Sequence, residues 1–595
     1  MNDFPLSKDS YVAFDGLSIK EKIRQRLNAS NIFTDQNFEG SNLAAFTDAF
    51  AMGLSMLLFN LSKGATEGSF SFAQIYENMN RIVKDIDYKP IGHQTSILSY
   101  TMSATTIDAG IYTIPRYTSI SVGGIPYSFS DDFSFTKLEN STTEEIDLND
   151  KGILHQGYFI EFPLFTASGT DNELIYITGS DSDIIDNFNI HVYIKSTENK
   201  WQKWSKTNSL YLHNSNDRVF EIRFNENKRY ELKFGNNING RRLNEGDLVA
   251  IYYLKSNGSS GEVGANVLRG KVATVYGTPQ FNQIIGDLET YSNYMTRSNI
   301  QYLLFDNSCT SSNYSEPESV SEIRANAPGT FRSQYRLVTK NDYETFIKTN
   351  FSNIIHDVIV MNNTEYLDSY IKYFYNIGLT QPQLESRAMF NQMKFADSCN
   401  FNNVYAFCVP KTISKRLGYL APSQKAFVKD TLDEEKTLTS EFVLMDPVYL
   451  AVDFALNPSG DTTIDDIQYT ELLIEKNYTS RRNDFSIITD VNAVINDYFN
   501  RSNYSLGQDI DSNVLLSNIL GIEGIKKVHT IRTDTGYSVE GLRMIIWNPI
   551  YPDLTTESIV GIKTIDDFQF PYFFDNNFKI RIVVQESSRH SGANY

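Results

Sequence analysis

The stretch FEGSNLAAFTDAFAMGLSMLLFNLSKG, residues 38–64, decides how the amino-terminal part of this chain folds. Between Leu43 and Leu61 the only formally charged side chain is that of Asp48. A run of this length and composition is close to what a hydropathy window flags as a membrane-spanning helix. The alternative is a helix that buries its apolar surface against protein, and the residues in and around the run choose between the two.

Polar and small residues argue against a lipid environment. Gly53 and Ser55 interrupt the run, and Asn60 and Lys63 close it. Insertion would also carry the Asp48 carboxylate into hydrocarbon, at a cost of up to roughly 2.5 to 3.5 kcal/mol. We therefore predict no membrane span. A helix that is apolar nearly all round is typical of the centre of a helical bundle, and if its own chain covers too little of it, other subunits must.

Two further helical patterns flank the run. Residues 17–30 (LSIKEKIRQRLNAS) alternate apolar and charged side chains near helical spacing, which predicts an amphipathic helix. Residues 71–86 (SFAQIYENMNRIVKDI) predict another helix, and Pro90 prevents its continuation. Residues 1–95 are therefore expected to form an α-helical arm.

Composition narrows the class of protein. The chain has 595 residues, too many for a single core, and should hold roughly three to five domains. Its formal net charge of -19 would repel a phosphate backbone, so we expect no nucleic-acid partner. Three cysteines are too few and too oddly spaced for a disulfide framework or a zinc site. The low cysteine count suggests a reducing site of synthesis. The amino terminus shows no basic or apolar signal region, so we expect no signal peptide.

From about residue 96 the pattern changes to short runs rich in Ile, Tyr, Thr and Phe, bounded by Gly, Pro, Asp and Asn. Runs such as GYFIEFPLF at 157–165 and DLVAIYYLK at 247–255 predict antiparallel strands and hairpins. Residues 96–275 are therefore expected to form a β-rich domain.

Residues 276–345 are expected to connect this domain to the rest. Residues 286–305 predict a helix, and the Ser-rich stretch at 308–322 predicts a hinge that a protease would cut first. The sequence TKNDYETFIKTN predicts another helix, with Thr339 or Asn341 as its cap.

Helical and strand patterns alternate in the remaining residues, in two successive groups that predict small α+β modules at 346–456 and 457–595. The expected fold class is thus multidomain α+β, with an N-terminal helical arm, an antiparallel β-domain and two C-terminal small α+β modules.

No pattern in the sequence specifies an active site. The acidic clusters lack the ligand offsets and the glycine of a calcium loop, and no phosphate loop, nucleophile elbow or zinc-protease motif is present. These clusters are Asp181 with Asp183, then Asp461, Asp465 and Asp466, then Asp509 with Asp511. His93, His356 and His529 stand singly and are expected to be packed or hydrogen-bonded. We expect no enzyme activity, no cofactor and no metal site.

A family resemblance is carried by an ordered series of segments rather than by one motif. The segments are 14–52, 74–92, 190–204, 232–266 and 322–358, followed by 446–457 and 493–529. Together they resemble the baseplate wedge protein of T-even-like contractile-tailed phages and its baseplate J-like relatives. Residues 276–320 and the last 50 or so match least well.

The resemblance implies a structural subunit of a contractile tail baseplate wedge, located in the virion and synthesised in the host bacterial cytoplasm. Its amino-terminal helices would form a bundle shared with a second copy and with another elongated wedge protein. Small sheath-initiator-type and other wedge proteins would be further partners. Its carboxy-terminal parts would join wedges into a ring around the hub, and the ring would relay conformational change at contraction.

On this interpretation, residues 43–61 are apolar because partner chains cover them. The expected contact residues are Leu43, Phe46, Asp48, Phe50, Leu54, Leu57, Leu58 and Leu61. The Asp48 carboxylate would be satisfied by a donor of a neighbouring chain or by a backbone group.

A receptor- or glycan-binding tail protein is the alternative function. It would use Trp201 and Trp204 as a platform for a sugar ring. Their offset of three places them on opposite faces of a strand, however, which favours core or interface roles. A cell-wall hydrolase would need a pair of acidic residues in a cleft, and nothing in the sequence selects such a pair.

Overall fold

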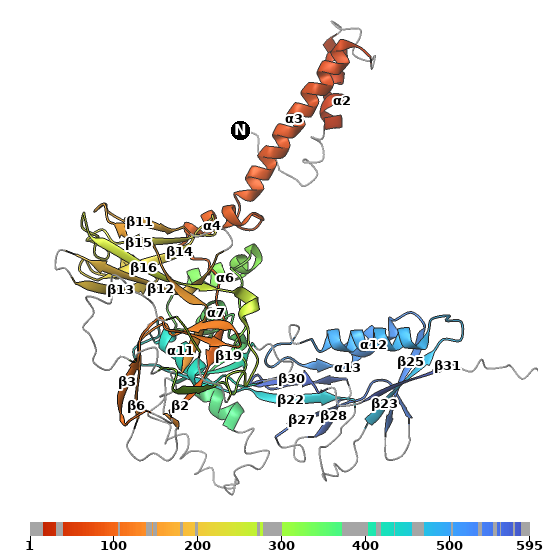
Figure 1. Ribbon diagram of the computed structural model, residues 1–595. Helices are drawn as coiled ribbons and strands as arrows, with labels where there is room; N and C mark the ends of the chain where they lie inside the picture. Colours follow the sequence, from red (N-terminus) through yellow and green to blue (C-terminus); the bar gives the residue numbers. More distant parts are fainter. Residues whose placement is uncertain are drawn as a thin grey trace, which may run out of the picture.

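The computed structural model describes residues 16–30, 40–104, 107–137, 145–146, 152–178, 183–196, 200–269, 274–277, 295, 300–371, 403–411, 418–433, 435–454, 469–500, 504–532, 538–550, 556–559, 561–574 and 578–584. A helical arm projects from a body built of β-sheets, and a second lobe extends sideways from the body (Figure 1). The multidomain α+β class predicted from the sequence is confirmed.

The arm consists of helices α2 (Gly16–Ser30) and α3 (Asn42–Glu67). The Ser41 side chain accepts a hydrogen bond from the Ala44 N–H at 3.0 Å, so α3 begins at a regular N-cap. At its other end the N–H of Gly68 bonds to the Gly64 carbonyl. Helix α2 runs back along the first half of α3, and no other described helix or strand lies beside the second half (Figure 1).

The root of the arm is held by helix α4 (Tyr76–Lys84), which lies on helix α6 (Val320–Ser333). Met79 and Val83 of α4 pack in a buried cluster with Ile323 of α6. Sequence positions almost 250 apart therefore meet where the arm joins the body.

The part of the body that follows α4 contains a five-stranded sheet, a three-stranded sheet and a hairpin. The five-stranded sheet has the order β1 (Ile97–Ser99), β8 (Ile153–Gln156), β5 (Ile125–Ser128), β4 (Ser119–Val122) and β17 (Thr274–Gly277). The three-stranded sheet has the order β18 (Leu303–Asp306), β2 (Thr101–Ala104) and β7 (Glu145–Ile146), and the hairpin pairs β3 (Gly110–Ile114) with β6 (Phe133–Lys137). Leu98, Tyr127 and Phe305 lie in one shared core.

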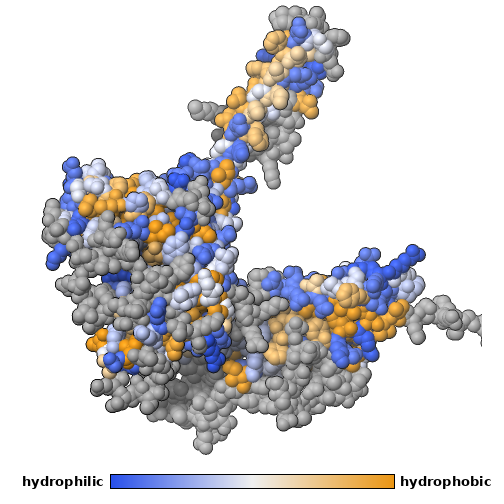
Figure 2. Space-filling model, viewed as in Figure 1, coloured by the Kyte–Doolittle hydropathy of each residue, from blue (hydrophilic) through white to orange (hydrophobic). Residues whose placement is uncertain are grey.

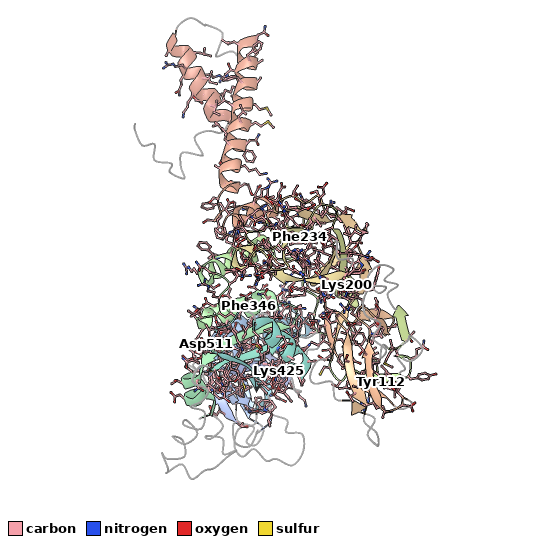
Figure 3. The ribbon with its side chains drawn as sticks, turned by 90° about the vertical axis from the view of Figure 1, so that its left-hand side faces the viewer. Tyr112, Lys200, Phe234, Phe346, Lys425 and Asp511 are labelled. Atoms are coloured by element: carbon pink, nitrogen blue, oxygen red, sulfur yellow. The ribbon has the colours of Figure 1, made fainter. Side chains whose placement is uncertain are left out.

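An eight-stranded sheet lies beneath the arm. Its order is β10 (Phe165–Thr166), β16 (Leu248–Ser256), β12 (Ile184–Lys195), β13 (Trp201–Thr207), β14 (Val219–Phe224), β15 (Tyr230–Phe234) and β11 (Leu174–Ile177), and β9 (Tyr158–Glu161) also pairs with β16. All pairs are antiparallel except β13 with β14, so the sheet is mixed. The side view separates Phe234, in the core of this sheet, from Tyr112 on the β3–β6 hairpin (Figure 3).

Helix α7 (Lys340–Asn350) and helix α11 (Pro422–Leu432) pack with a three-stranded sheet of β19 (Ile355–Asn362), β20 (Asn403–Pro410) and β21 (Glu441–Met445). Thr339 caps α7, as predicted, in a capping box with Asp342. The shorter elements are η1 (Leu210–Leu212), η2 (Gly258–Gly261), α8 (Asn363–Glu365) and the π-helical turn η3 (Tyr366–Ile371).

The lateral lobe holds two four-stranded sheets and two helices. One sheet has the order β28 (Glu557–Ile559), β27 (Met544–Trp547), β22 (Val448–Asp453) and β30 (Gln569–Phe573). The other has the order β26 (Ser538–Glu540), β25 (Ile525–Arg532), β23 (Tyr469–Lys476) and β31 (Lys579–Val584). A small ladder pairs β24 (Ile510–Asp511) with β29 (Ile562–Lys563).

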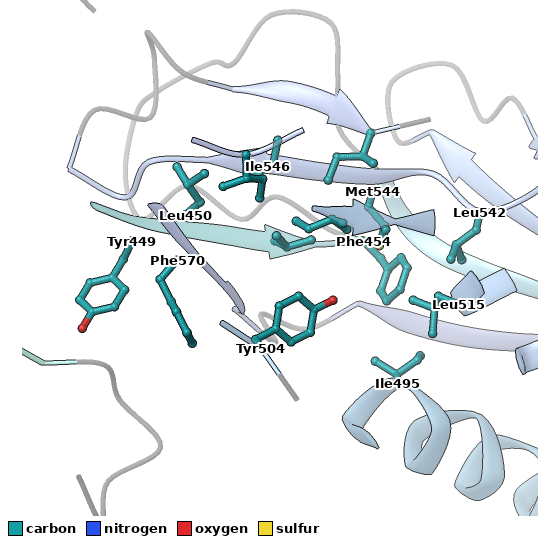
Figure 4. Close-up of a cluster of buried hydrophobic side chains, with 14 of the residues drawn as sticks. Tyr449, Leu450, Phe454, Ile495, Tyr504, Leu515, Leu542, Met544, Ile546 and Phe570 are labelled. Carbon is teal, nitrogen blue, oxygen red and sulfur yellow. The ribbon is translucent and has the colours of Figure 1, made fainter. Parts of the chain in front are cut away.

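Helices α12 (Asp484–Tyr498) and α13 (Ser512–Leu520) share one core with these sheets. Figure 4 shows Ile495 of α12 and Leu515 of α13 facing Phe454 and Met544. Strand β22 is hydrogen-bonded to β27 and β30, so this lobe draws on residues from both sides of position 456.

The structure contradicts one prediction for the connector. Most of the helix predicted at 286–305 lies outside the described residues, but its end is wrong, because 303–306 is strand β18. Leu303 and Phe305 point into the core while β2 supplies the hydrogen-bonding ladder. A pairing partner about 200 residues away therefore overrides the local pattern.

The stretch 308–322, predicted as a hinge, is hydrogen-bonded to the β-domain. Ser311 and Ser312 are buried, and each exchanges hydrogen bonds with a strand or loop of the β-domain. The hydroxyl of Ser312 accepts from the Ile97 N–H at 2.8 Å, and that of Ser311 accepts from the Val263 N–H at 3.0 Å. The serine side chains thus satisfy neighbouring backbone groups and fasten this stretch to the sheet.

Candidate assembly interface

Helix α3 exposes much of the apolar surface that the sequence assigns to an interface. Phe46 is 75% exposed, Phe50 63%, Leu57 63% and Leu61 69%. Leu43, Leu54 and Leu58 are half-buried. Figure 2 shows apolar side chains along the surface of the arm. A folded chain rarely leaves so many large apolar side chains together in water unless another molecule covers them.

Helix α2 covers one face of α3. Ala44, Thr47 and Ala51 of α3 are buried, and Ile19 of α2 is buried opposite them. The small side chains of the two alanines allow the helices to approach closely. This face is closed within the chain and needs no partner.

Two apolar seams on α3 remain uncovered by the described residues. The first seam consists of Phe46, Phe50, Leu57 and Leu61. The second seam consists of Met52, Met56 and Phe59, which are exposed as well. At 3.6 residues per turn the two seams lie roughly 140° apart around the helix, with the α2-covered face on the other side.

The second seam is missing from the predicted contact residues. Its spacing of four and then three residues is as regular as that of the first seam and was available in the sequence. The prediction passed over Phe59 and both methionines, although methionine is common at adaptable binding surfaces.

Asp48 has its ionic partner within the chain. Its carboxylate lies 2.5 Å from the ammonium of Lys20 on α2, and both groups are partly exposed. This partner was not predicted from the sequence, and the expected donor from a neighbouring chain or from the backbone remains a prediction. Helix α2 folds back along α3 and places Lys20 beside the start of that helix.

Among the described residues, Asn42–Glu67 forms a helix with an 18-residue window that is long and apolar enough to cross a membrane, by length and composition. Only 17% of that window is buried within the chain. Length and composition alone therefore do not decide whether protein or lipid covers α3.

The histidines singled out in the sequence are hydrogen-bonded, as predicted. His93 Nδ1 contacts the Tyr314 hydroxyl at 2.5 Å, and burial lowers the pKa of His93. His529 Nε2 lies 3.1 Å from a Glu475 carboxylate oxygen. In the described part of the chain, no group of three or more His, Cys, Asp or Glu side chains could hold a metal ion.

The acidic clusters have structural roles where they are described. Asp183 pairs with Lys255 at 2.6 Å, Asp509 accepts from the Ile565 N–H, and Asp511 caps α13. Asp181, Asp461, Asp465 and Asp466 lie outside the described residues.

The two tryptophans do not form a joint platform. Trp204 is buried, with its ring 5.8 Å from that of Phe234, whereas Trp201 packs with a separate cluster that includes Tyr193. The prediction that they lie on opposite faces of a strand is confirmed. No described geometry therefore favours sugar stacking by this pair.

The comparisons with known proteins agree with the resemblance noted in the sequence. No family model matches the chain. The chain is similar to the baseplate wedge protein gp6 of Enterobacteria phage T4, with 23% identity over 363 residues that cover 57% of this chain and 50% of that protein. The chain thus spans about half the length of this curated relative. A resemblance to a baseplate wedge protein is confirmed.

The chain is also similar to a chain in a cryo-EM structure of the anti-feeding prophage baseplate, 6-fold symmetrised. The similarity covers 94% of this chain and 90% of that chain. Its TM-score is 0.28 and its sequence identity is 10%.

Proposed function

We propose that this protein is a structural subunit of a contractile phage tail baseplate wedge, located in the virion tail and synthesised in the host bacterial cytoplasm. The similarity to a baseplate wedge protein supports the setting. The observation that carries the proposal is the exposure of two apolar seams on a rigid helix that projects from the body. Such a helix suits a protein whose purpose is to be covered by other subunits.

The seams define what the partners must supply. Because the two seams point in directions roughly 140° apart, a single additional helix cannot cover both. We assign one seam to a second copy of this chain and the other to another elongated wedge protein, in a shared helical bundle. Small sheath-initiator-type and other wedge proteins are further partners, and the proposal includes neither nucleic acid nor a membrane span.

We further propose that the carboxy-terminal parts join wedges into a ring around the hub, and that the ring relays conformational change at contraction. The lateral lobe supports this part of the proposal, because it extends away from the arm and so separates two contact regions on one chain (Figure 1). The role is non-catalytic in this proposal, as the name of the wedge protein relative suggests.

Co-expression of the full chain with candidate wedge proteins, followed by mass measurement of the purified complexes, tests this function. We expect complexes that contain two copies of this chain and at least one other wedge protein. A chain that stays solitary with every candidate, or that floats with lipid vesicles in their absence, would overturn the proposal.

A further inference from the structure

The carboxylate of Glu318 joins three segments at the root of the arm. The Tyr88 hydroxyl donates to both carboxylate oxygens, at 2.8 and 2.9 Å. The Ile91 N–H donates to one of them at 3.0 Å, and the Asn326 side-chain amide of α6 donates to the other at 2.8 Å. The Glu318 N–H in turn donates to the Ile91 carbonyl at 3.1 Å. One side chain thus ties the strap after α4 to the start and middle of α6.

Neutral donors, rather than a cation, hold this carboxylate. No described lysine or arginine forms an ion pair with Glu318, and burial raises its pKa. Tyr88, its principal donor, is buried. Loss of the carboxylate would leave the Tyr88 hydroxyl and the Ile91 N–H without their acceptor away from water, which is costly.

Other contacts surround this junction and place the arm directly on α6. The Arg324 guanidinium of α6 donates to the carbonyls of Phe70 and Ala73, which lie between α3 and α4. The Tyr335 hydroxyl, just beyond α6, donates to the Asp87 carbonyl at 3.0 Å.

A packed path leads from this junction into the carboxy-terminal half. Helix α6 is followed by α7, and Tyr343 and Ile347 of α7 lie in one buried cluster with Val358 and Val360 of β19. Helices α4, α6 and α7 and strand β19 follow one another below the arm (Figure 1). Helix α4 is also bonded to the eight-stranded sheet, where the Asn80 side-chain amide donates to the Phe224 carbonyl at 2.9 Å.

We propose that Glu318 is a latch that fixes the strap at the root of the arm, from Tyr88 to Ile91, to α6, so that a displacement of the arm passes to α7 and β19 as a rigid-body movement. Residues 308–322, which the sequence predicts as a hinge, then contain the residue that fastens the root of the arm to α6. What moves the arm rests on the proposed function, but the latch is a property of the isolated chain and is tested there.

The test measures the distance between the arm and α7 in the isolated full-length chain. Spin labels are placed on Ala65→Cys of α3 and Asn341→Cys of α7, both exposed, in a background with Cys309→Ser and Cys399→Ser. Double electron–electron resonance then reports the distribution of distances. We expect one narrow distribution in the labelled parent, because the latch holds a single arm angle.

Three substitutions separate the latch from general damage. A hydrogen bond to a charged group is worth roughly tenfold or more in an equilibrium constant. Tyr88→Phe should therefore raise the population of molecules in which the Glu318 latch is broken about tenfold, and Glu318→Ala should raise it about a hundredfold or more. Glu316→Ala, which removes an exposed carboxylate two residues away, should leave the distribution unchanged.

Amide exchange supplies a second readout that does not depend on the labels. Faster exchange of the Ile91 N–H in Tyr88→Phe and Glu318→Ala, with unchanged exchange in the core of α7, would support the latch. Narrow distance distributions and parental exchange in both variants would overturn it. Because no partner chain is present, this outcome is independent of whether the chain assembles into wedges.

Discussion

The first apolar seam should matter little to the isolated chain and much to its assembly. Complete burial of a phenylalanine side chain is worth about 1.5 to 3 kcal/mol. Phe46 is 75% exposed and Phe50 63% exposed, so most of that free energy is not yet gained within the chain. Covering both rings should contribute about 2 to 4 kcal/mol to assembly, whereas each contributes less than about 1 kcal/mol to the fold.

The double substitution Phe46→Ser with Phe50→Ser tests this reasoning. It should weaken association with a second copy or with a wedge partner by about 30-fold to 1,000-fold, as measured by analytical ultracentrifugation. The thermal midpoint of the isolated chain, followed by circular dichroism, should change little. Met79→Ala is the matched control, because Met79 is fully buried at the root of the arm and its truncation should cost about 2 to 5 kcal/mol.

Two results would refute the argument. Unchanged association of the double variant would mean that the first seam is not covered in the assembly. A loss of several kcal/mol from the isolated chain would mean that the seam is already covered within one molecule. The Met79→Ala result shows how large such a loss is in this region.

Three further predictions follow from individual residues. Gly157→Ala should lower the free energy of unfolding by more than about 2 kcal/mol, because Gly157 has a φ of +126° and an added Cβ would overlap the Lys255 carbonyl. Gly124 also has a positive φ but faces open space, so Gly124→Ala should lower it less in the same thermal melts. Burial lowers the pKa of His191 to about 3, below its unfolded value of 6.5. The neutral ring should therefore contribute stability that is lost as the pH falls through about 6.5 toward 3, with a slope of at most about 1.4 kcal/mol per pH unit. Thermal melts recorded as a function of pH should show that His191→Gln flattens this slope. Limited proteolysis read by mass spectrometry should leave residues 308–322 intact during the first cleavages, because Ser311 and Ser312 are buried and bonded to the β-domain. Early cleavage in this stretch would instead support the predicted hinge.

Local patterns sufficed for several helices and for many strands. Thr339 and Asp342 form the capping box of α7, and the amphipathic spacing of 17–30 corresponds to α2. These signals lie within a few residues of one another, and so the local sequence specifies them. The same holds for the tryptophan pair, whose offset of three fixes opposite faces of β13.

Long-range pairing accounts for what the sequence could not show. The LLFD segment at 303–306 is a strand because β2 lies beside it, and the serines near 311 are buried because Val263 and Ile97 present backbone groups to them. A serine-rich stretch is exposed to solvent only when no other part of the chain forms hydrogen bonds with its hydroxyl groups. Similarly, Lys20 was visible as one of several basic residues, but its pairing with Asp48 depends on how α2 folds back.

That fold-back also bears on what covers α3. Helix α2 runs along the first half of α3 and carries Lys20, Lys22, Arg24 and Arg26 on its surface. A bilayer around that half would have to accommodate α2 as well, and each basic side chain at the bilayer centre costs roughly 2.5 to 3.5 kcal/mol on the insertion scale. Partner helices would cover the two seams and leave the basic face of α2 in water. The position of α2 therefore favours protein over lipid, even though hydropathy and length alone do not separate them.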